Sequence, residues 1–311
     1  MAGGAKSRTP KQSIPSRWVK CISTHGRIRG VAIQATSLAQ ETCVRHKLHG
    51  DAARGMGEAL MGSLLIASYC KEGERVNLNI QGDAGFRQAL VEAKPDGTAR
   101  GYLIERDPTS FVANPAFGPW GGGTLSVLRT RDREREQPYI GTVPLLTGHL
   151  AKDLTFYWAQ SEQVPSAVGL AVVVRDDVIV SAGGFLIQIM PGATAEEVRT
   201  VETHINEIQS LAEQLGESGG DPLALLGQIF QSTAFVLLEE KELGFFCNCS
   251  MERAHRALSL IGPSELQAIL REEDHASVHC DFCAKEYRVG REELEKLIAA
   301  ASSETPPETP A

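Results

Sequence analysis

With 311 residues, the chain is long enough for one large domain with a small satellite, or for two modest domains. Its content of 42% apolar and 23% charged residues is typical of a globular protein. A formal net charge of -8 argues against non-specific nucleic-acid binding, which needs a basic surface, and no apolar run approaches the roughly 18 residues of a membrane span.

The start of the chain is basic and lacks acidic side chains. The first forty residues contain no Asp or Glu, and their basic residues are Lys6, Arg8, Lys11, Arg17, Lys20, Arg27 and Arg29. No apolar stretch of the kind that marks a secretory signal follows, so we expect a cytoplasmic protein, with a transit segment as the alternative. Residues 1–13 are predicted to be a disordered tail. The cysteines of such a chain indicate a reducing compartment, where thiols stay free or bind metal.

Residues 14–190 are predicted to form an α+β core domain. The stretch 59–69 is apolar on most faces and predicts a buried helix, and the alternation in 76–80 predicts a strand. Other expected elements are strands at 31–33, 101–105, 123–129, 167–174, 178–180 and 185–189, with helices from Thr36 or Ser37 and around 147–162. Strands outnumber helices and no strict βαβ alternation occurs, so a mixed, strand-rich fold is expected.

Residues 191–240 are predicted to be a helical, apolar linker. Thr194 and Glu197 form a capping box in front of a helix. Apolar residues then recur at helical spacing, namely Val198, Val201, Ile205, Ile208, Ala212 and Leu215. Gly216 is a natural end for this helix, and residues 217–220 are predicted to be a hinge.

A dense apolar run follows the hinge. Nine large apolar side chains lie within sixteen residues: Leu223, Leu225, Leu226, Ile229, Phe230, Phe235, Val236, Leu237 and Leu238. Full burial of all nine contributes roughly 14–27 kcal/mol at about 1.5–3 each, whereas ordering sixteen residues costs on the order of 24 kcal/mol. Because these values nearly cancel, the run is predicted to be metastable and to need a docking surface.

Four cysteines mark a predicted zinc-binding domain at residues 241–298. Cys247 and Cys249 form a C-x-C pair, and Cys280 and Cys283 form a C-x-x-C pair. Two close pairs are typical of Zn²⁺ held by four thiolates. Because the region has few large apolar residues, we expect metal ligation to stabilise it, by an apparent ~10–16 kcal/mol.

Two helices are predicted between the cysteine pairs. Ser250 can cap the first, which would run to about Leu260, and the second would start near Gly262 and end near Leu270. This helical excursion would fold back and bring the two pairs together. Residues 299–311 are predicted to be a second disordered tail.

The C-x-C spacing favours a site that can open. A disulfide between Cys247 and Cys249 would close a very small ring in which ideal geometry is hard to reach, and strained disulfides are typically labile or regulatory. Bound Zn²⁺ keeps sulfurs as thiolates, the form that oxidants attack. From the residues alone, a redox-responsive site and a static structural site remain equally open.

The chain resembles the 33 kDa chaperonin family, the redox-regulated heat-shock holdases. The resemblance covers about residues 25–295. It rests first on a C-x-C motif, a gap of about thirty residues and a C-x-x-C motif. These lie in the segments Phe246-Cys247-Asn248-Cys249-Ser250 and His279-Cys280-Asp281-Phe282-Cys283, the second followed by Tyr287. Further segments that resemble the family lie in the predicted core domain: Val76 to Asp83, Gly101-Tyr102, Gly141 to Val143, Ser161 to Pro165, and Ala182 to Gln188.

The resemblance implies a redox-regulated, ATP-independent chaperone of the stress response that is not an enzyme. The reduced protein would hold zinc through Cys247, Cys249, Cys280 and Cys283. Oxidation would release the metal, join Cys247 to Cys249 and Cys280 to Cys283, and unfold the linker. The exposed surface would bind unfolding client proteins, usually as a homodimer, without nucleotide, nucleic acid or membrane. The client-binding residues would include Leu223, Leu226, Ile229, Phe230, Phe235 and Leu237.

Two other functions fit parts of the sequence. A static zinc ribbon could dock RNA or a protein partner through Lys285, Arg288 and Arg291, although acidic residues outnumber these three nearby. A thiol oxidoreductase could use Cys280 and Cys283, but such a motif normally opens a helix after a strand in a βαβ unit, and the predicted elements lack that context.

Overall fold

The computed structural model describes residues 15–110, 114–131, 138–208, 210–217 and 220–303. The chain divides into two compact units, Met1–Phe245 and Phe246–Ala311, and each is described by itself. Among the residues that the structure describes, no helix is long and apolar enough to cross a membrane.

The larger unit contains two β-sheets. The five-stranded sheet has the order β10-β1-β2-β9-β8 and consists of β1 (Arg17–Ser23), β2 (Ile28–Gln34), β8 (Ser166–Arg175), β9 (Val178–Ile189) and β10 (Phe235–Glu242). The six-stranded sheet has the order β11-β5-β4-β3-β6-β7 and consists of β3 (Glu74–Gly82), β4 (Phe86–Ala93), β5 (Thr98–Glu105), β6 (Gly123–Arg131), β7 (Tyr139–Pro144) and β11 (Gly244–Phe245). Neighbouring strands are antiparallel except for β11, which pairs parallel with β5.

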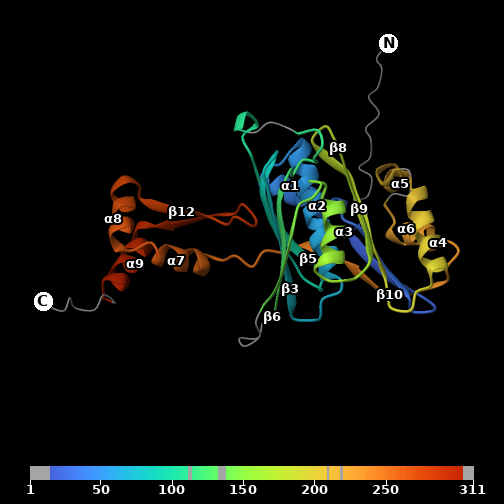
Figure 1. Ribbon diagram of the computed structural model, residues 1–311. Coiled ribbons are helices and arrows are strands. Elements are labelled where there is room, and N and C mark those ends of the chain that lie inside the picture. The colour runs from blue at the N-terminus through green and yellow to red at the C-terminus, as the bar shows by residue number, and fades with distance from the viewer. Residues whose placement is uncertain (1–14, 111–113, 132–137, 209, 218–219, 304–311) are drawn as a thin grey trace, which may run out of the picture. The chain divides into compact units, whose positions relative to one another are not determined.

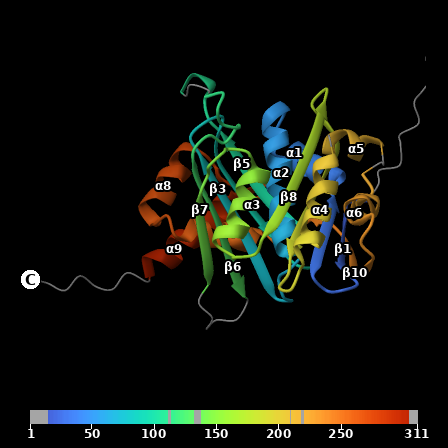
Figure 2. The ribbon, with the colours of Figure 1, turned by 45° about the vertical axis from the view of Figure 1, so that its right-hand side comes forward.

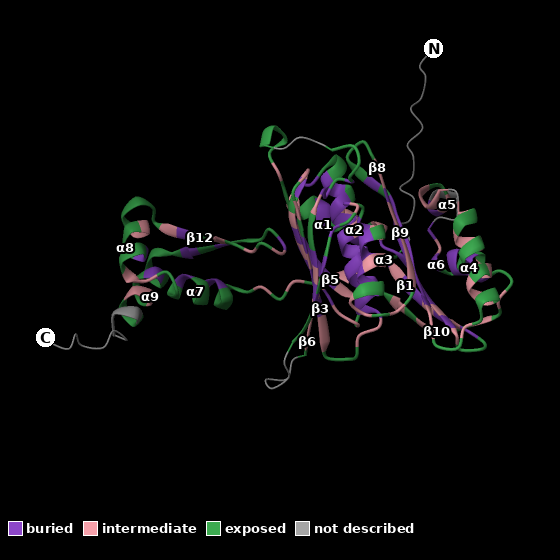
Figure 3. Ribbon diagram, viewed as in Figure 1, coloured by how far each residue is buried: buried purple, intermediate pink, exposed green. Residues whose placement is uncertain are grey.

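A helical layer fills the space between the two sheets (Figures 1 and 2). It consists of α1 (Thr36–His46), α2 (Gly50–Ala67) and α3 (Leu150–Gln160), and a short 3-10 turn, η1 (Pro108–Ser110), lies after β5. The central helix α2 is buried along most of its length (Figure 3) because it contacts strands of both sheets. This arrangement confirms the predicted α+β, strand-rich class.

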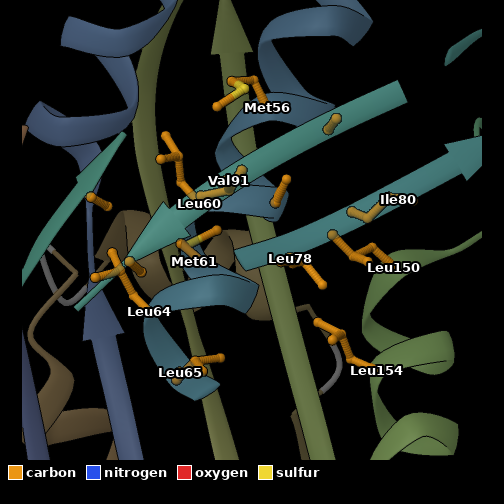
Figure 4. Packing of buried hydrophobic residues seen from close by; sticks show 14 of the residues in the cluster. Met56, Leu60, Met61, Leu64, Leu65, Leu78, Ile80, Val91, Leu150 and Leu154 are labelled. Carbon is orange, nitrogen blue, oxygen red and sulfur yellow. The ribbon is translucent and has the colours of Figure 1, made fainter. Parts of the chain in front are cut away.

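The core packs the apolar side chains of α2 against β3, β4 and α3. Figure 4 shows these contacts among Met56, Leu60, Met61, Leu64, Leu65, Leu78, Ile80, Val91, Leu150 and Leu154. Leu78 and Ile80 are fully buried at alternate positions of β3, as the period-two pattern predicts. At Gly62 of α2, an added Cβ would lie 2.7 Å from Leu154 Cδ1, so the glycine allows α3 to approach closely.

Three helices cover the other face of the five-stranded sheet. They are α4 (Ala195–Glu207), α5 (Leu211–Glu217) and α6 (Pro222–Phe230). The capping box predicted at Thr194 and Glu197 is present at the start of α4. The single helix expected up to Leu215 is instead two helices, because Ile208 leaves the helical conformation with ψ 85°. This break allows Leu215 of α5 to pack on Gly183 of β9.

Residues 235–240 were predicted to belong to the helical linker, and the structure places them in strand β10. They pair antiparallel with β1, where Lys20 lies opposite Glu239 and their side chains form a 3.1 Å ion pair. The pairing has a bulge: Lys20 is opposite Glu239 and Cys21 is opposite Leu237, so Leu238 has no partner in β1. The boundary between the compact units follows Phe245, so Lys241 belongs to the larger unit.

In its described part, residues 246–303, the smaller unit consists of a hairpin and three helices. These are α7 (Met251–Ser259), α8 (Pro263–Glu272), β12 (His275–His279), β13 (Glu286–Gly290) and α9 (Arg291–Ser303). Its buried apolar core is small, with Leu258, Leu266, Ala276, Val289 and Leu294. Residues 299–303, expected in a disordered tail, belong to α9, whose Leu294 is fully buried in this core. The predicted tail 1–13 and residues 304–311 lie outside the described residues.

Candidate metal centre

The structure brings together the sulfurs of the four cysteines of the C-x-C and C-x-x-C pairs. Their Sγ atoms all lie within 4.8 Å of one another. Cys247 Sγ lies 3.7 Å from Cys280 Sγ, and Cys249 Sγ lies 3.4 Å from Cys283 Sγ. Four Zn–S bonds of about 2.3 Å in a tetrahedron separate the sulfurs by about 3.8 Å. The spacing and the all-thiol donor set therefore fit a tetrahedral zinc ion, and the cluster could hold one.

The C-x-C pair is held by the first turn of α7. Ser250 is the N-cap of this helix, and its hydroxyl accepts a hydrogen bond from the Arg253 amide at 3.3 Å, as the sequence predicts. Arg253 also donates from Nη1 to the side-chain oxygen of Asn248, at 3.0 Å. Because Asn248 lies between the two cysteines, these bonds fix the loop that presents Cys247 and Cys249.

The C-x-x-C pair lies in the turn between β12 and β13. The amides of Cys283 and Ala284 both donate to the Cys280 carbonyl, at 3.2 and 2.8 Å, and the Cys280 amide donates to the Lys285 carbonyl at 3.0 Å. Ala284 has a left-handed backbone with φ 57°, which reverses the chain directly after the second cysteine. This tight turn points Cys280 and Cys283 at the same site, which explains the two-residue spacing.

Tyr287 contacts the cluster from β13. Its hydroxyl donates a hydrogen bond to Cys249 Sγ at 3.0 Å, and its side chain is buried, with 7% exposure. The Lys285 ammonium lies 4.7 Å from the centre of the ring. In the sequence, Tyr287 stands out only as part of the family motif, and no role is predicted for it there. The alternation of Tyr287 and Val289 in a strand after the last cysteine was the one available sign that the ring faces inward.

The four thiols differ in how readily they ionise. Burial raises the pKa of Cys249, but hydrogen bonds from Tyr287 and the neighbouring thiols outweigh it and lower this pKa to about 7. Burial raises the pKa of Cys283 to about 12, and burial also raises the pKa of Cys280. A divalent cation supplies the positive charge that keeps all four sulfurs ionised. Binding of a metal at this centre would therefore release protons and would strengthen as the pH rises.

Of the three basic residues named for RNA binding, the two arginines are paired with carboxylates in the structure, and Lys285 lies over the ring of Tyr287. Arg288 Nε lies 3.0 Å from Glu286, and Arg291 forms an ion pair with Asp274. The C-x-x-C pair lies between two strands of a hairpin and does not open a helix. Neither the basic face of a nucleic-acid module nor the strand–helix context of a thiol oxidoreductase is found around this cluster.

The residues expected to bind clients lie in the larger unit, on α6 and β10. Leu226, Ile229 and Phe230 of α6 are fully buried. Leu223 is 39% exposed at the start of the helix, and Leu237 of β10 is 52% exposed. Phe235 is partly buried, and its ring centre lies 5.2 Å from that of Phe230.

The buried part of α6 packs on the five-stranded sheet. Its apolar cluster includes Val19, Cys21, Ile28, Ala32, Phe185 and Ile187. Gly30 of β2 makes this contact possible, since an added Cβ would lie 3.1 Å from Phe230 and 3.2 Å from Leu226. Polar contacts lie at its edge: Arg17 pairs with Asp221 at 3.0 Å, and the His204 ring is hydrogen-bonded to the Ile229 carbonyl at 3.0 Å. The docking of α6 therefore depends mainly on apolar burial.

Comparisons with known proteins agree over most of the chain. A family model described as Hsp33 protein matches residues 16–290. The 33 kDa chaperonin of Geobacter sulfurreducens is 36% identical over 286 residues, covering 90% of this chain and 93% of that protein. The 33 kDa chaperonin of Limosilactobacillus fermentum is 35% identical over 290 residues, covering 90% and 98%. The crystal structure of the 33 kDa chaperonin (heat shock protein 33 homolog) of Thermotoga maritima superposes with a TM-score of 0.83 at 28% identity, covering 94% of this chain and all of that one.

Proposed function

Because the chain belongs to the Hsp33 family of 33 kDa chaperonins, we propose that it is a redox-regulated holdase that binds unfolding proteins without ATP. The observation that carries the proposal is the cluster of four thiols at tetrahedral spacing, close in the chain to a docked apolar segment. The cysteines are regulatory in this proposal, and the protein is not an enzyme. It acts in the cytoplasm, where free thiols persist.

In the reduced state, Cys247, Cys249, Cys280 and Cys283 hold one zinc ion as thiolates. A zinc ion held by these four thiolates would link the loop before α7 to the β12–β13 turn. The smaller unit needs such a link because the core formed by its described residues has only a few fully buried apolar side chains, among them Leu266 and Val289. Structural zinc in small domains contributes an apparent ~10–16 kcal/mol, which exceeds the stability of most domains of this size.

Oxidation by peroxide converts the four thiolates into two disulfides. One thiolate attacks a peroxide oxygen, breaks the O–O bond and becomes a sulfenic acid, with release of hydroxide. A second thiolate attacks the sulfenic sulfur, forms the S–S bond and releases a second hydroxide. Two thiolates and one peroxide thus give one disulfide and two hydroxides. The proposed products join Cys247 to Cys249 and Cys280 to Cys283, so no thiolate ligand remains.

The proposed disulfides differ from the contacts of the reduced centre. The short sulfur contacts run between the pairs, from Cys247 to Cys280 and from Cys249 to Cys283. Disulfides within each pair would therefore replace contacts that join two parts of the smaller unit. This loss of cross-linking supports the proposal that oxidation unfolds the unit.

The proposed client surface is the apolar segment on α6 and β10, with Leu223, Leu226, Ile229, Phe230, Phe235 and Leu237. Leu226, Ile229 and Phe230 are buried in the docked state, whereas Leu237 is already exposed. Release of α6 would therefore expose these three side chains in addition to Leu237. Uncovering these side chains would also uncover the sheet face around Gly30. Contiguous apolar patches of this kind mark protein-interaction sites. We propose that the oxidised protein binds clients as a homodimer.

The test is suppression of light scattering by a chemically unfolded, aggregating client, without nucleotide. Zinc-loaded reduced protein is compared with peroxide-treated protein at mildly elevated temperature. Suppression only after oxidation supports the proposal. Equal suppression in both states would mean that the metal is merely structural, and no suppression in either state would reject the holdase function.

A further inference from the structure

The hydroxyl of Tyr287 donates to Cys249 Sγ at 3.0 Å, and it is a polar side-chain contact to this sulfur from outside the cluster. We propose that Tyr287 is a positioning residue that sets how readily the metal centre is oxidised, because its hydrogen bond withdraws electron density from Cys249 and holds this sulfur in place. The proposal rests on the proposed function, and it assigns a role to a residue that is neither a metal ligand nor a client contact.

The position of Tyr287 suits this role because it joins the two halves of the centre. The tyrosine lies in β13, directly after the turn that carries Cys280 and Cys283, whereas Cys249 precedes α7. In the hairpin, Tyr287 pairs with Val278, and the ring is buried. A buried aromatic ring on a paired strand has little rotational freedom. Its hydroxyl is therefore held at one place relative to Cys249 Sγ.

Two other sulfurs of the centre accept hydrogen bonds from backbone amides. Cys280 accepts from the Phe282 amide and Cys283 accepts from the Lys285 amide. These two bonds come from the backbone of the turn, so they do not depend on the side chains at positions 282 and 285. The bond to Cys249 differs because a side chain supplies it, so a single substitution can remove it without changing the fold of the turn. The Lys285 ammonium, 4.7 Å from the ring centre, polarises the phenol toward donation.

The direction of the effect follows from the chemistry of thiolates. All four sulfurs are thiolates while a metal is bound, so a hydrogen-bond donor cannot increase the fraction that is ionised. What remains is its effect on the lone pairs, which become less nucleophilic when they are hydrogen-bonded. Attack on peroxide uses a lone pair of the sulfur, breaks the O–O bond and releases hydroxide, as above. Tyr287 therefore slows this step at Cys249.

The experiment compares zinc-loaded wild-type protein with Tyr287→Phe, which keeps the ring and removes the hydroxyl. Zinc release after peroxide addition is followed with a chromogenic chelator, so no client is needed. Because hydrogen bonds to charged groups are stronger than neutral ones, we expect release to be roughly 3–10 times faster in the variant. Ser277→Ala is the matched control. It removes a hydroxyl from the same hairpin, one that donates to Glu286 at 2.7 Å and touches no sulfur.

A spectroscopic readout separates hydrogen bonding from a general loosening of the site. In the cobalt-substituted protein, loss of the donor raises the energy of the sulfur lone pairs, so the thiolate-to-metal charge-transfer band should move to longer wavelength in Tyr287→Phe and stay unchanged in Ser277→Ala. As a second variant, 3-fluorotyrosine at position 287 keeps the shape and donates more strongly, so it should release zinc more slowly than wild type.

These outcomes are distinct from the test of the proposed function. Equal release rates and equal spectra in metal-loaded wild type and Tyr287→Phe would overturn the role of Tyr287 and leave the holdase proposal intact. A red-shifted band with faster release supports it, even if no client is ever held. Faster release without a shift of the band would also overturn it, because the cause would then be a looser fold.

Discussion

Glu197 of α4 accepts a 2.7 Å hydrogen bond from Arg27 of the β1–β2 turn. The same carboxylate closes the capping box, since it accepts from the Thr194 amide at 2.8 Å. The start of the helical segment is thus fastened to the five-stranded sheet by one side chain that also begins the helix. The hydrogen bond from the Thr194 amide is the main cause that holds the pKa of Glu197 below its ordinary value, and Arg27 contributes less.

Arg27→Ala should loosen the attachment of α4 in the reduced protein. Partly exposed ion pairs contribute little to stability, so we expect limited proteolysis between α4 and α6 to become about two to five times faster at pH 7. The pKa of Glu197 is lowered on folding, so its contribution is present above the unfolded pKa and is lost as the pH falls through the folded one. The difference between variant and wild type should therefore shrink below about pH 4. Arg45→Ala, which removes a pair within α1, should leave cleavage unchanged.

Cys280→Ser should abolish metal binding and unfold the smaller unit. Removal of one of four thiolates leaves an incomplete donor set, and the small core cannot replace the apparent ~10–16 kcal/mol that zinc supplies. The measurements are zinc content per chain and helical circular dichroism, both of which should fall. Cys70→Ser is the control, because this thiol donates to the Ile66 carbonyl in the core and lies far from the cluster in the chain. A variant with one zinc per chain would disprove the ligand assignment.

Phe230→Ala should undock α6 without oxidation. Phe230 is fully buried against Gly30 and Phe235, and truncation of a buried Phe typically costs about 3–5 kcal/mol. The zinc-loaded, reduced variant should bind an apolar dye and suppress client aggregation, whereas reduced wild type should do neither. Gln228→Ala shortens an exposed polar side chain of the same helix that is not part of the proposed client surface, and it should behave as wild type. An inactive reduced Phe230→Ala protein would show that docking of α6 does not control activity.

Glu58→Gln should stabilise the larger unit at alkaline pH. Burial raises the pKa of this half-buried carboxyl on α2 from 4.5 to about 7, and Arg54 lowers it only in part. The folded protein therefore binds the proton more tightly than the unfolded chain, and stability falls as the pH rises from about 4.5 to 7. We expect a gain of about 1–3 kcal/mol at pH 8 and none at pH 4.

Thermal unfolding from pH 4 to pH 8 measures this effect. Glu41→Gln is the control, since Glu41 is exposed and paired with Arg45 in α1. If Glu58→Gln changes the melting temperature equally at both ends of the pH range, the shift arises from packing and not from the charge.

Local signals in the sequence predicted the parts of the structure that depend on neighbours in the chain. The capping box at Thr194, the cap at Ser250, the buried helix α2 and the period-two strand β3 all follow from such signals. The spacing of the two cysteine pairs predicted their meeting, because C-x-C before a helix and C-x-x-C in a turn are compact units that a metal can join.

The missed elements depend on contacts that sequence spacing does not show. Strand β1 has no alternation because residues on both of its faces are buried, including Trp18 and Val19. The bulge at Leu238 interrupts the alternation of apolar and polar residues in strand β10. Its apolar run was therefore predicted to belong to a helical linker. The contact of Tyr287 with Cys249 joins residues 38 positions apart, and only the folded smaller unit reveals it.

The segment 235–245 closes an edge of each sheet in the larger unit. It pairs with β1 as β10 and, directly after Leu243, with β5 as β11. On a ribosome, β10 is made more than two hundred residues after its partner β1. Until that segment emerges, the nascent chain carries two unpaired strand edges of the kind that recruit other chains. A protein proposed to guard others from aggregation thus passes through synthesis with its own sheets open.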